Sequence, residues 1–302
     1  MEVPGPRALR PLPGVRRRVT LDPQRAGDDR QRLARALRDL RKASGLSGER
    51  LARRCNMSQS KISRIENGRA LPSVVDVERV LLALSVDAAT RDELLNLARV
   101  ANTEFRDIRA SVRRGLHHRQ RELAALEGTA THMRYFLPSL VTGLLQTPEY
   151  MRAAMDMPIE PAKGDTTRAV ALKLERQRVL HDPSKRFEFL LTEQAVTWRL
   201  CAPPVMALQL DRLVSLSRLP NVRIGVVPTT RDLGVGPMNT FTLYDRHLVT
   251  VETFTGQIVL RDPKDIAHHV SLFAYFSDRS LWGNESRSFL LAASREFMRP
   301  RE

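Results

Sequence analysis

Large apolar residues recur at three- and four-residue steps from residue 28 onward, a spacing that predicts helices. Glycines Gly45 and Gly68 fall where the first and third of these segments end. The five predicted helices, with their apolar positions, are one from Asp28 (Leu33, Ala36, Leu37, Leu40), Ser47–Arg54 (Leu51, Ala52), Ser58–Asn67 (Ile62, Ile65), one from Pro72 and Ser73 (Val77, Val80, Leu81, Leu84), and Thr90–Ala101. We therefore expect a compact all-α domain over residues 28–99.

Residues 123–302 combine helical periodicity with short β-branched and aromatic runs that predict strands. Helices are expected at 135–155, 166–180, 203–217, 262–281 and 284–298, and strands at 186–192, 222–228, 240–245 and 248–254. Helices around a small, mostly antiparallel sheet make an α+β domain. The predicted fold is mainly α, with a five-helix domain followed by this α+β domain.

Positive charge is concentrated at the start of the chain. Residues 1–122 carry 27 Lys and Arg against 15 Asp and Glu, which accounts for +12 of the formal net charge of +15. Such an excess favours an anionic partner, whether nucleic acid, a membrane surface or an acidic protein. Residues 1–27, rich in Pro, Gly and Arg, predict a basic flexible arm that is either a solvated tail or a contact to DNA. Residues 100–122 predict a basic helical connector.

The third predicted helix separates its apolar and polar residues between two faces. At 100° per residue, Ile62 and Ile65 lie on one side, and Ser60, Ser63, Arg64 and Asn67 on the other. The outward face carries hydrogen-bonding groups and a cation but no carboxylate, which suits phosphates and base edges. Because a three-residue turn at 55–57 joins it to the helix before, the pair predicts a helix-turn-helix unit whose second helix enters the major groove. A solvated polar face on a small bundle is the alternative interpretation.

The segment Leu37–Leu84, which ends its helix pair with "SKISRIENG", resembles the Xre/phage-repressor (Cro/C1-type) helix-turn-helix family. Matching positions imply that Gln59, Ser60 and Arg64 face bases. They also imply phosphate contacts for the residues at the two helix starts and around the recognition helix, Ser47, Ser58, Lys61, Asn67 and Arg69. The same match implies a buried ion pair between Arg41 and Glu66. The chain has Gly48 where many relatives have Gln on the second helix, so the operator preference is expected to differ.

The segments "LVTGLLQTPEYMRAAM", "LLTEQAVTWRL" and "VRIGVVP" resemble the C-terminal domain of WhiJ-like actinobacterial regulators, as does the stretch at 262–290. In that group an Xre domain precedes this domain, and the gene often lies beside one for a small acidic protein. The resemblance implies a regulator whose second domain, residues 123–302, serves dimerisation and control. It also implies a development, antibiotic-production or antitoxin-like context, and it does not identify a ligand.

Catalytic, metal and cofactor motifs are missing from the sequence. There is no HExxH, GxSxG, GxxxxGK[ST] or GxGxxG pattern, and Glu193 and Glu252 are a carboxylate pair whose separation nothing in the sequence fixes. Cys55 and Cys201 lie far apart and are expected to be reduced thiols of a cytoplasmic protein. No apolar run approaches the ~20 residues that span a bilayer. We therefore expect a non-enzyme that uses no metal or cofactor and contacts no membrane.

The sequence as a whole predicts a cytoplasmic, sequence-specific DNA-binding transcriptional regulator, associated with the nucleoid when bound to double-stranded DNA. A homodimer reading a pseudo-palindromic operator is expected, controlled by a small-molecule effector or a small acidic protein. The alternative is an antitoxin-like protein-interaction module whose DNA binding is secondary autoregulation. An enzyme within residues 123–302 is a third, less favoured interpretation.

Overall fold

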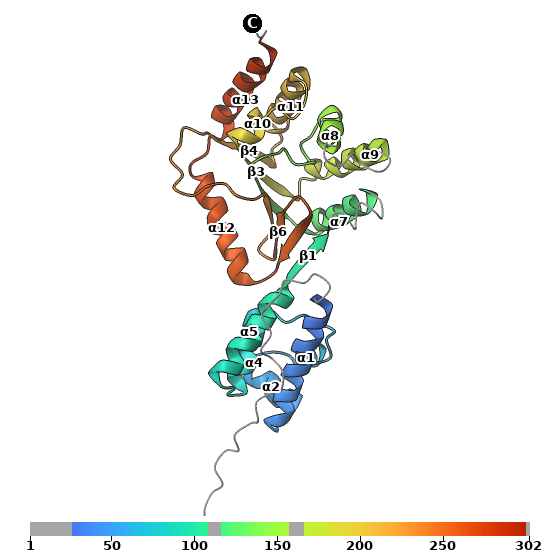
Figure 1. Cartoon of the computed structure of the whole chain (residues 1–302), viewed down its shortest axis with the longest axis vertical. Helices are drawn as coiled ribbons and strands as arrows, with labels where there is room; N and C mark the ends of the chain where they lie inside the picture. Colours follow the sequence, from blue (N-terminus) through green and yellow to red (C-terminus); the bar gives the residue numbers. More distant parts are fainter. Residues whose placement is uncertain (1–25, 108–115, 157–165, 300–302) are drawn as a thin grey trace, which may run out of the picture.

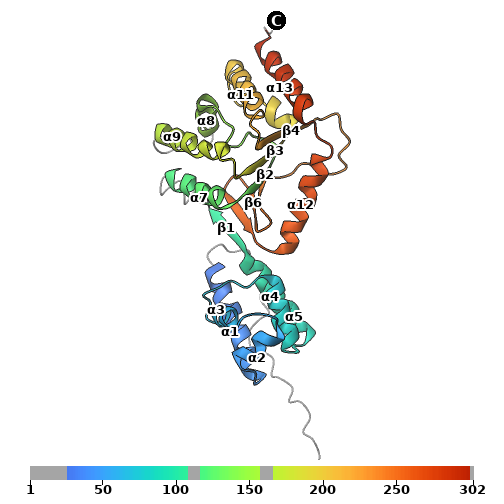
Figure 2. The same ribbon diagram turned by 180° about the vertical axis from the view of Figure 1, so that it is seen from behind.

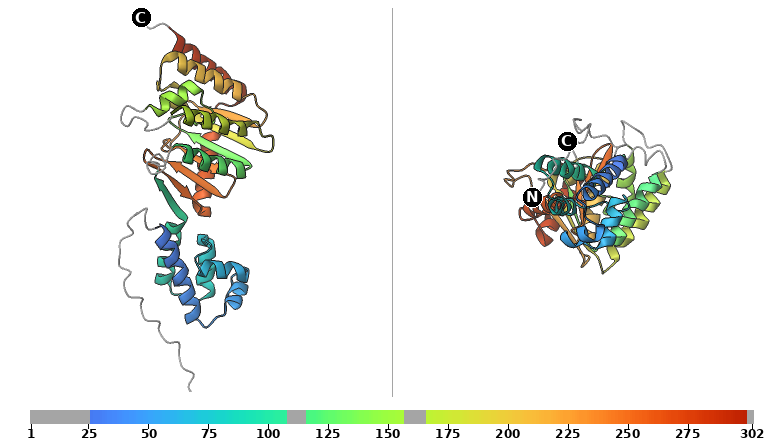
Figure 3. Two further views of the ribbon diagram at one scale, coloured as in Figure 1. Left: turned by 90° about the vertical axis from the view of Figure 1, so that its right-hand side faces the viewer. Right: turned by 90° about the horizontal axis from the view of Figure 1, so that it is seen from below.

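The computed structural model describes residues 26–107, 116–156 and 166–299. A helical domain lies at one end of the molecule and a larger domain with a central sheet lies at the other (Figure 1). The views at right angles show the same two parts, joined through a strand that continues directly from the last helix of the first domain (Figure 3). Residues 1–25 of the predicted arm and 108–115 of the predicted connector fall outside the described residues.

The first domain contains the five predicted helices, each with a local reason for where it begins or ends. The side chains of Ser47, Ser58, Ser73 and Asp87 accept hydrogen bonds from backbone amides at the starts of helices two to five. Gly45 and Gly68 adopt positive φ angles of 67° and 66° after helices one and three. The helices are α1 (Ala26–Ala43), α2 (Gly48–Arg54), α3 (Gln59–Glu66), α4 (Val74–Ala83) and α5 (Ala88–Asn102).

The second domain is built on one seven-stranded mixed sheet in the order β1-β7-β6-β5-β2-β3-β4. The pairs from β1 to β2 across this order are antiparallel, and β2-β3 and β3-β4 are parallel. The strands are β1 (Thr103–Asp107), β2 (His132–Leu137), β3 (Arg186–Thr192), β4 (Val222–Val227), β5 (Phe241–Tyr244), β6 (Leu248–Glu252) and β7 (Gly256–Leu260). The sheet is therefore mostly antiparallel, as predicted.

Helices cover both faces of this sheet, as Figure 2 shows from behind. Alternate residues of β3 serve the two cores, with Phe187 and Phe189 in one cluster and Leu190 in the other. Helix α12 (Pro263–Ser277) packs on one face, against β4, β5 and β6. The helices on the other side are α7 (Leu116–Thr129), α8 (Pro148–Met155), α9 (Thr166–Arg176) with the 3₁₀ turn η2 (Gln177–His181), α10 (Glu193–Thr197), α11 (Pro203–Leu216) and α13 (Gly283–Met298).

The helix predicted at residues 135–155 is wrong in its first half. Residues 132–137 form β2, in the middle of the sheet, and only Pro148–Met155 is helical. Tyr135, Phe136 and Leu137 are buried and apolar in succession, so this half of the strand lacks the alternation that identifies a strand from sequence. Strand β7 is not among the predicted strands, because Gly256 and Gln257 precede an apolar run of only three residues.

The connector predicted to be helical over residues 100–122 contains a strand instead. Helix α5 ends at Asn102, and β1 starts at the next residue, where Thr103 pairs with Leu260 of β7. Helix α7 then begins at Leu116, before the predicted start of the second domain. The strand depends on an edge more than 150 residues away, which local periodicity does not reveal. Among the described residues, no helix is long and apolar enough to cross a membrane.

Candidate nucleic-acid interface

Helices α2 and α3 and the turn between them form the predicted helix-turn-helix unit. Asn56, at the centre of the turn, has φ of 53°, a left-handed conformation that asparagine adopts more readily than most residues. Met57 N then donates to Ala52 O at 2.9 Å, which closes the turn against the end of α2. The hydroxyl of Ser58 accepts from Lys61 N at 3.2 Å and caps α3. Local sequence thus sets the angle at which α3 leaves α2.

The inward face of α3 is fixed in the core of the first domain. Ile62 and Ile65 are each 2% exposed and share a cluster with Leu37 of α1 and Leu51 of α2. Burying two isoleucine side chains contributes about 3–6 kcal/mol to folding. This packing holds α3 rigidly, so its opposite face is presented in one orientation.

An ion pair behind α3 connects it to α1, at the two positions that the family resemblance implies. Arg41 Nε lies 2.6 Å from Glu66 Oε1 and Arg41 Nη2 lies 2.7 Å from Glu66 Oε2, a two-pronged arrangement. Arg41 Nη1 also donates to Leu46 O at 3.0 Å in the loop before α2. Hydrogen bonding to Glu66 raises the pKa of Arg41, although burial works in the opposite direction. One guanidinium therefore fixes the spacing of α1, α3 and the start of α2.

The outward face of α3 is uncovered. Gln59, Ser60 and Arg64 are all exposed, and neither the rest of the first domain nor the sheet domain lies over them. Within the described residues, their side chains form no hydrogen bond or ion pair. The structure therefore brings the three predicted base-facing residues together on one free surface. A guanidinium, an amide and a hydroxyl are the groups that read base edges in the major groove.

The residues expected to contact phosphates divide into two groups. The hydroxyls of Ser47 and Ser58 are occupied as helix caps, accepting from Arg50 N and Lys61 N at 3.2 Å. Asn67 Nδ2 donates to Ser63 O at 2.9 Å, so this amide caps the end of α3. Arg69 is exposed and has no side-chain partner in the described part of the chain. Of these four, only Arg69 presents a functional group without an intramolecular role.

Lys61 is held in an ion pair that the sequence interpretation did not foresee. Its Nζ lies 2.8 Å from Asp76 Oδ1, and Asp76 in turn accepts from Ser73 N at 3.2 Å as the third residue of α4. Burial raises the pKa of Asp76, but the hydrogen bonds from Lys61 and Ser73 outweigh it and lower the pKa overall. The signal for Asp76 was present in the capping pattern Ser73-x-x-Asp76. The sequence contains no comparable signal for the ion pair between Asp76 and Lys61.

Two protein families match along the chain. The family model described as "Domain of unknown function (DUF5753)" matches residues 120–292, and one described as "Helix-turn-helix domain" matches residues 32–94. The second match covers α2, α3 and the ion pair behind them and supports DNA as a partner. A comparison with curated proteins gives no match.

Two solved structures show low similarity. The first is Nuc, a phospholipase D family member from Salmonella typhimurium, which is 10% identical with a TM-score of 0.32 over 54% of this chain and 90% of that chain. The second is TrmBL2, an archaeal chromatin protein described with a novel mode of DNA binding, which is 9% identical with a TM-score of 0.29 over 78% of this chain and 87% of that chain. Neither similarity is high enough to assign a fold or a function.

Proposed function

Because this chain belongs to the DUF5753 family and carries a helix-turn-helix domain before the family's domain, we propose that it is a sequence-specific transcriptional regulator. The observation that carries the proposal is the uncovered face of α3, where Gln59, Ser60 and Arg64 stand on a helix held by a partly buried ion pair. Within the helix-turn-helix class, the match to "SKISRIENG" favours the Xre type. The group would be WhiJ-like, and the protein would act in the cytoplasm, on the nucleoid.

The chemistry of this face suits the major groove. Arg64 can donate two hydrogen bonds to guanine O6 and N7, and Gln59 can pair with adenine N6 and N7. Arg69, at the end of the helix, is placed to bind the phosphate backbone. The backbone of a rigid helix loses little conformational freedom on binding, which lowers the ordering cost of these contacts.

A homodimer would place two copies of α3 about 34 Å apart on one face of a pseudo-palindromic operator. The second domain would then have a regulatory rather than a catalytic role. A ligand or partner that favours one spacing of the two helices shifts operator affinity by its differential binding energy. The net charge of +15 favours a small acidic protein as such a partner.

The test compares Arg64→Ala with Arg295→Ala, a control that removes an exposed arginine on α13 far along the chain from the helical domain. Binding of the full chain to DNA from its own upstream region is measured by fluorescence anisotropy, beside a scrambled duplex. Arg64→Ala should lose about 1–3 kcal/mol on the upstream DNA and little on the scrambled one. Equal losses for both variants, or none for Arg64→Ala, would refute the role of α3.

The antitoxin-like alternative makes a different prediction. If the chain acts chiefly by binding the acidic product of a neighbouring gene, a pull-down should recover that product equally with and without operator DNA. Competition between the product and the DNA would instead place the partner within the control of transcription.

A further inference from the structure

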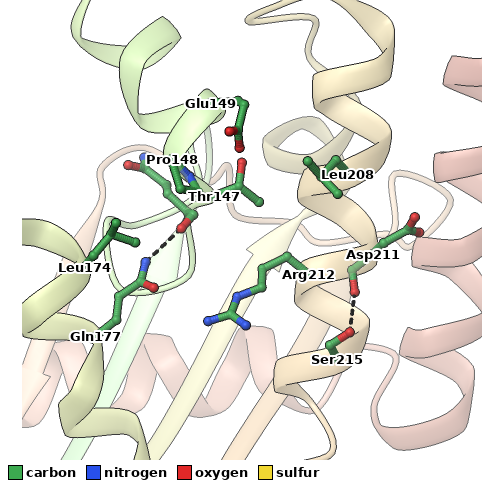
Figure 4. Close-up of a pocket in the computed structure, with 10 residues that line it drawn as sticks. Thr147, Pro148, Glu149, Leu174, Gln177, Leu208, Asp211, Arg212 and Ser215 are labelled. Carbon is green, nitrogen blue, oxygen red and sulfur yellow. Dashed lines mark hydrogen bonds between the residues drawn. The ribbon is translucent and has the colours of Figure 1, made fainter. Parts of the chain in front are cut away.

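A cleft opens on the helical side of the second domain, away from the helical domain's α3. It lies between the start of α8, the junction of α9 with η2, and the outward face of α11, and its volume is about 490 Å³. Clefts of about 300–1,000 Å³ hold most small ligands. Figure 4 shows side chains from all three elements converging on it.

Two walls of the cleft each carry one large apolar side chain that is exposed to solvent. Leu174 of α9 is 39% exposed and Leu208 of α11 is 50% exposed, and they face the same space. Large apolar side chains are normally buried, and a pair on opposite walls offers a site for an apolar group of a ligand. The walls alone do not select a ligand, so the polar groups decide its class.

A guanidinium extends into the cleft without a partner. Figure 4 shows Arg212 reaching from α11 across the cleft toward Gln177. In the described residues it has no hydrogen bond or ion pair. The neighbouring carboxylate of Asp211 points away from it, and accepts from Ser294 Oγ of α13 at 3.0 Å. Arg212 is thus available to a carboxylate of a ligand.

The floor of the cleft carries an acceptor in a fixed position. Gln177 is 6% exposed, and its Nε2 donates to Gly143 O at 2.9 Å and to Gln146 O at 2.7 Å. These bonds orient the amide and leave Oε1 without a partner among the described residues. An acceptor held in this way costs nothing to arrange when a donor binds.

One carboxylate also borders the cleft. Glu149, in the first turn of α8, lies 3.7 Å from Arg152, a long contact between two exposed side chains. Its negative charge disfavours a purely anionic ligand, just as Arg212 disfavours a purely cationic one. The cleft is therefore complementary to a ligand that carries both charges, separated by an apolar body.

We propose that this cleft binds a short hydrophobic peptide, with its carboxylate on Arg212, its ammonium group toward Glu149, a peptide N–H donating to Gln177 Oε1, and its apolar side chains between Leu174 and Leu208. The volume of the cleft and the opposite charges of Arg212 and Glu149 favour a short peptide over a free fatty acid or an amine, each of which carries one charge.

The position of the cleft connects it to the first domain. Arg176, the residue before Gln177, turns to the other side of α9, where its Nε lies 3.1 Å from Glu127 Oε2 of α7. Both side chains are buried, at 6% and 2% exposure, and Arg176 also donates to Gln120 of α7. Helix α7 follows the segment that leaves β1 and α5. A peptide that shifts α9 would therefore act on α7, the first helix of the second domain along the chain. We infer that the peptide also changes operator affinity; this second part rests on the proposed function.

The binding test uses leucyl-leucine as the probe, with the full chain, in a calorimeter. The wild-type chain should bind leucyl-leucine more tightly than leucyl-leucine amide, which lacks the carboxylate. Arg212→Gln should reduce the affinity by about 10- to 100-fold, the value of a charged hydrogen bond. Arg295→Gln, on an exposed position of α13, should leave it unchanged. Unchanged melting temperatures would show that the variants are folded.

No binding of leucyl-leucine, or equal binding by wild type and Arg212→Gln, overturns the proposed site. Leu208→Ala gives an independent check, because losing this apolar side chain should weaken binding of the dipeptide without altering the preference of the cleft for leucyl-leucine over leucyl-leucine amide.

Regulation is measured separately, as the fold-change in operator affinity on adding leucyl-leucine. If leucyl-leucine binds in a way that depends on Arg212 but leaves operator affinity unchanged, only the regulatory part of the proposal is overturned. Failure of Arg64→Ala to weaken DNA binding overturns the proposed function and leaves the calorimetric result standing.

Discussion

Lys61 Nζ lies 2.8 Å from Asp76 Oδ1, so an ion pair joins helix α3 to the first turn of α4. Asp76 is the more buried partner, with 12% of its side chain exposed against 46% for Lys61. The family resemblance implies that Lys61 binds a DNA phosphate. In the free protein that charge is already compensated, and a phosphate must compete with a carboxylate that also accepts a helix-capping hydrogen bond from Ser73 N.

Replacing Asp76 with Asn should release Lys61 and strengthen DNA binding. The amide oxygen of Asn can still accept from Ser73 N, while the negative charge next to Lys61 is lost. Affinity should rise by a similar factor for cognate and scrambled duplexes, and the slope of log K against log[salt] should steepen by about 0.9, the value of one added phosphate contact. Anisotropy titrations over a range of salt concentrations measure both.

Lys61→Ala provides the control for this prediction. In the Asp76→Asn background it should return the salt slope to that of the wild type. In the wild-type background it should change the slope little. A large loss of affinity from Lys61→Ala alone would show that the lysine leaves Asp76 for the DNA backbone, contrary to our expectation.

Glu66→Gln should destabilise the first domain by about 1.5–3 kcal/mol, the value of hydrogen bonds to a charged group, because it leaves the partly buried charge of Arg41 without its carboxylate. The matched control is Glu49→Gln, which breaks the exposed pair of Glu49 with Arg53 on α2. That pair should contribute less than about 1 kcal/mol. Urea unfolding of the full chain, followed by circular dichroism, compares the two variants. Similar losses would mean that burial adds nothing to the Arg41–Glu66 pair.

Short-range features of this fold were predictable from sequence, and long-range ones were not. The starts of α2 and α3 at Ser47 and Ser58 follow from caps within three residues, and the end at Gly68 follows from its left-handed backbone. Helical periodicity placed Ser60 and Arg64 on the outward face, whereas the base-facing role of Gln59 came from the resemblance to a family. The Arg41–Glu66 pair spans 25 residues and was available only through the resemblance to a family.

The elements that were missed depend on partners distant in the chain. Strand β2 lies between β5 and β3, and its second half, residues 135–137, is buried and apolar in succession, which periodicity does not distinguish from a helix. Strand β1 exists because β7 offers an edge. The cleft of Arg212 needs three helices to converge, and no spacing within one of them indicates it. Periodicity reports which face of an element is buried but not what covers that face.

Gly68 and Gly48 should respond oppositely to replacement by alanine. Gly68 has φ of 66°, and an added Cβ would lie 2.8 Å from the side chain of Gln31, so Gly68→Ala should cost about 1–2 kcal/mol through backbone strain. Gly48 begins α2 and has no atom within 4 Å of an added Cβ. Gly48→Ala should stabilise by about 0.5–1 kcal/mol by restricting the unfolded chain. Melting temperatures of the two variants test this, and a destabilising Gly48→Ala would contradict the open environment of that position.

Glu127 should make the second domain less stable as pH rises. Burial raises the pKa of Glu127 from its ordinary 4.5 to about 7, although Arg176, a hydrogen bond from Tyr135 and the charge of Lys185 oppose the shift. Since the folded state holds the proton more tightly than the unfolded one, the stabilisation is complete below about pH 4.5 and is lost as pH rises through about 7, by an amount on the order of 3 kcal/mol. Glu127→Gln imitates the protonated side chain. Its free energy of unfolding should therefore match that of the wild type near pH 5 and exceed it at pH 8. Urea unfolding at both pH values measures the difference. A variant that is less stable than the wild type at pH 8 would contradict this prediction. It would mean that the attraction of Arg176 outweighs the cost of burying the Glu127 charge.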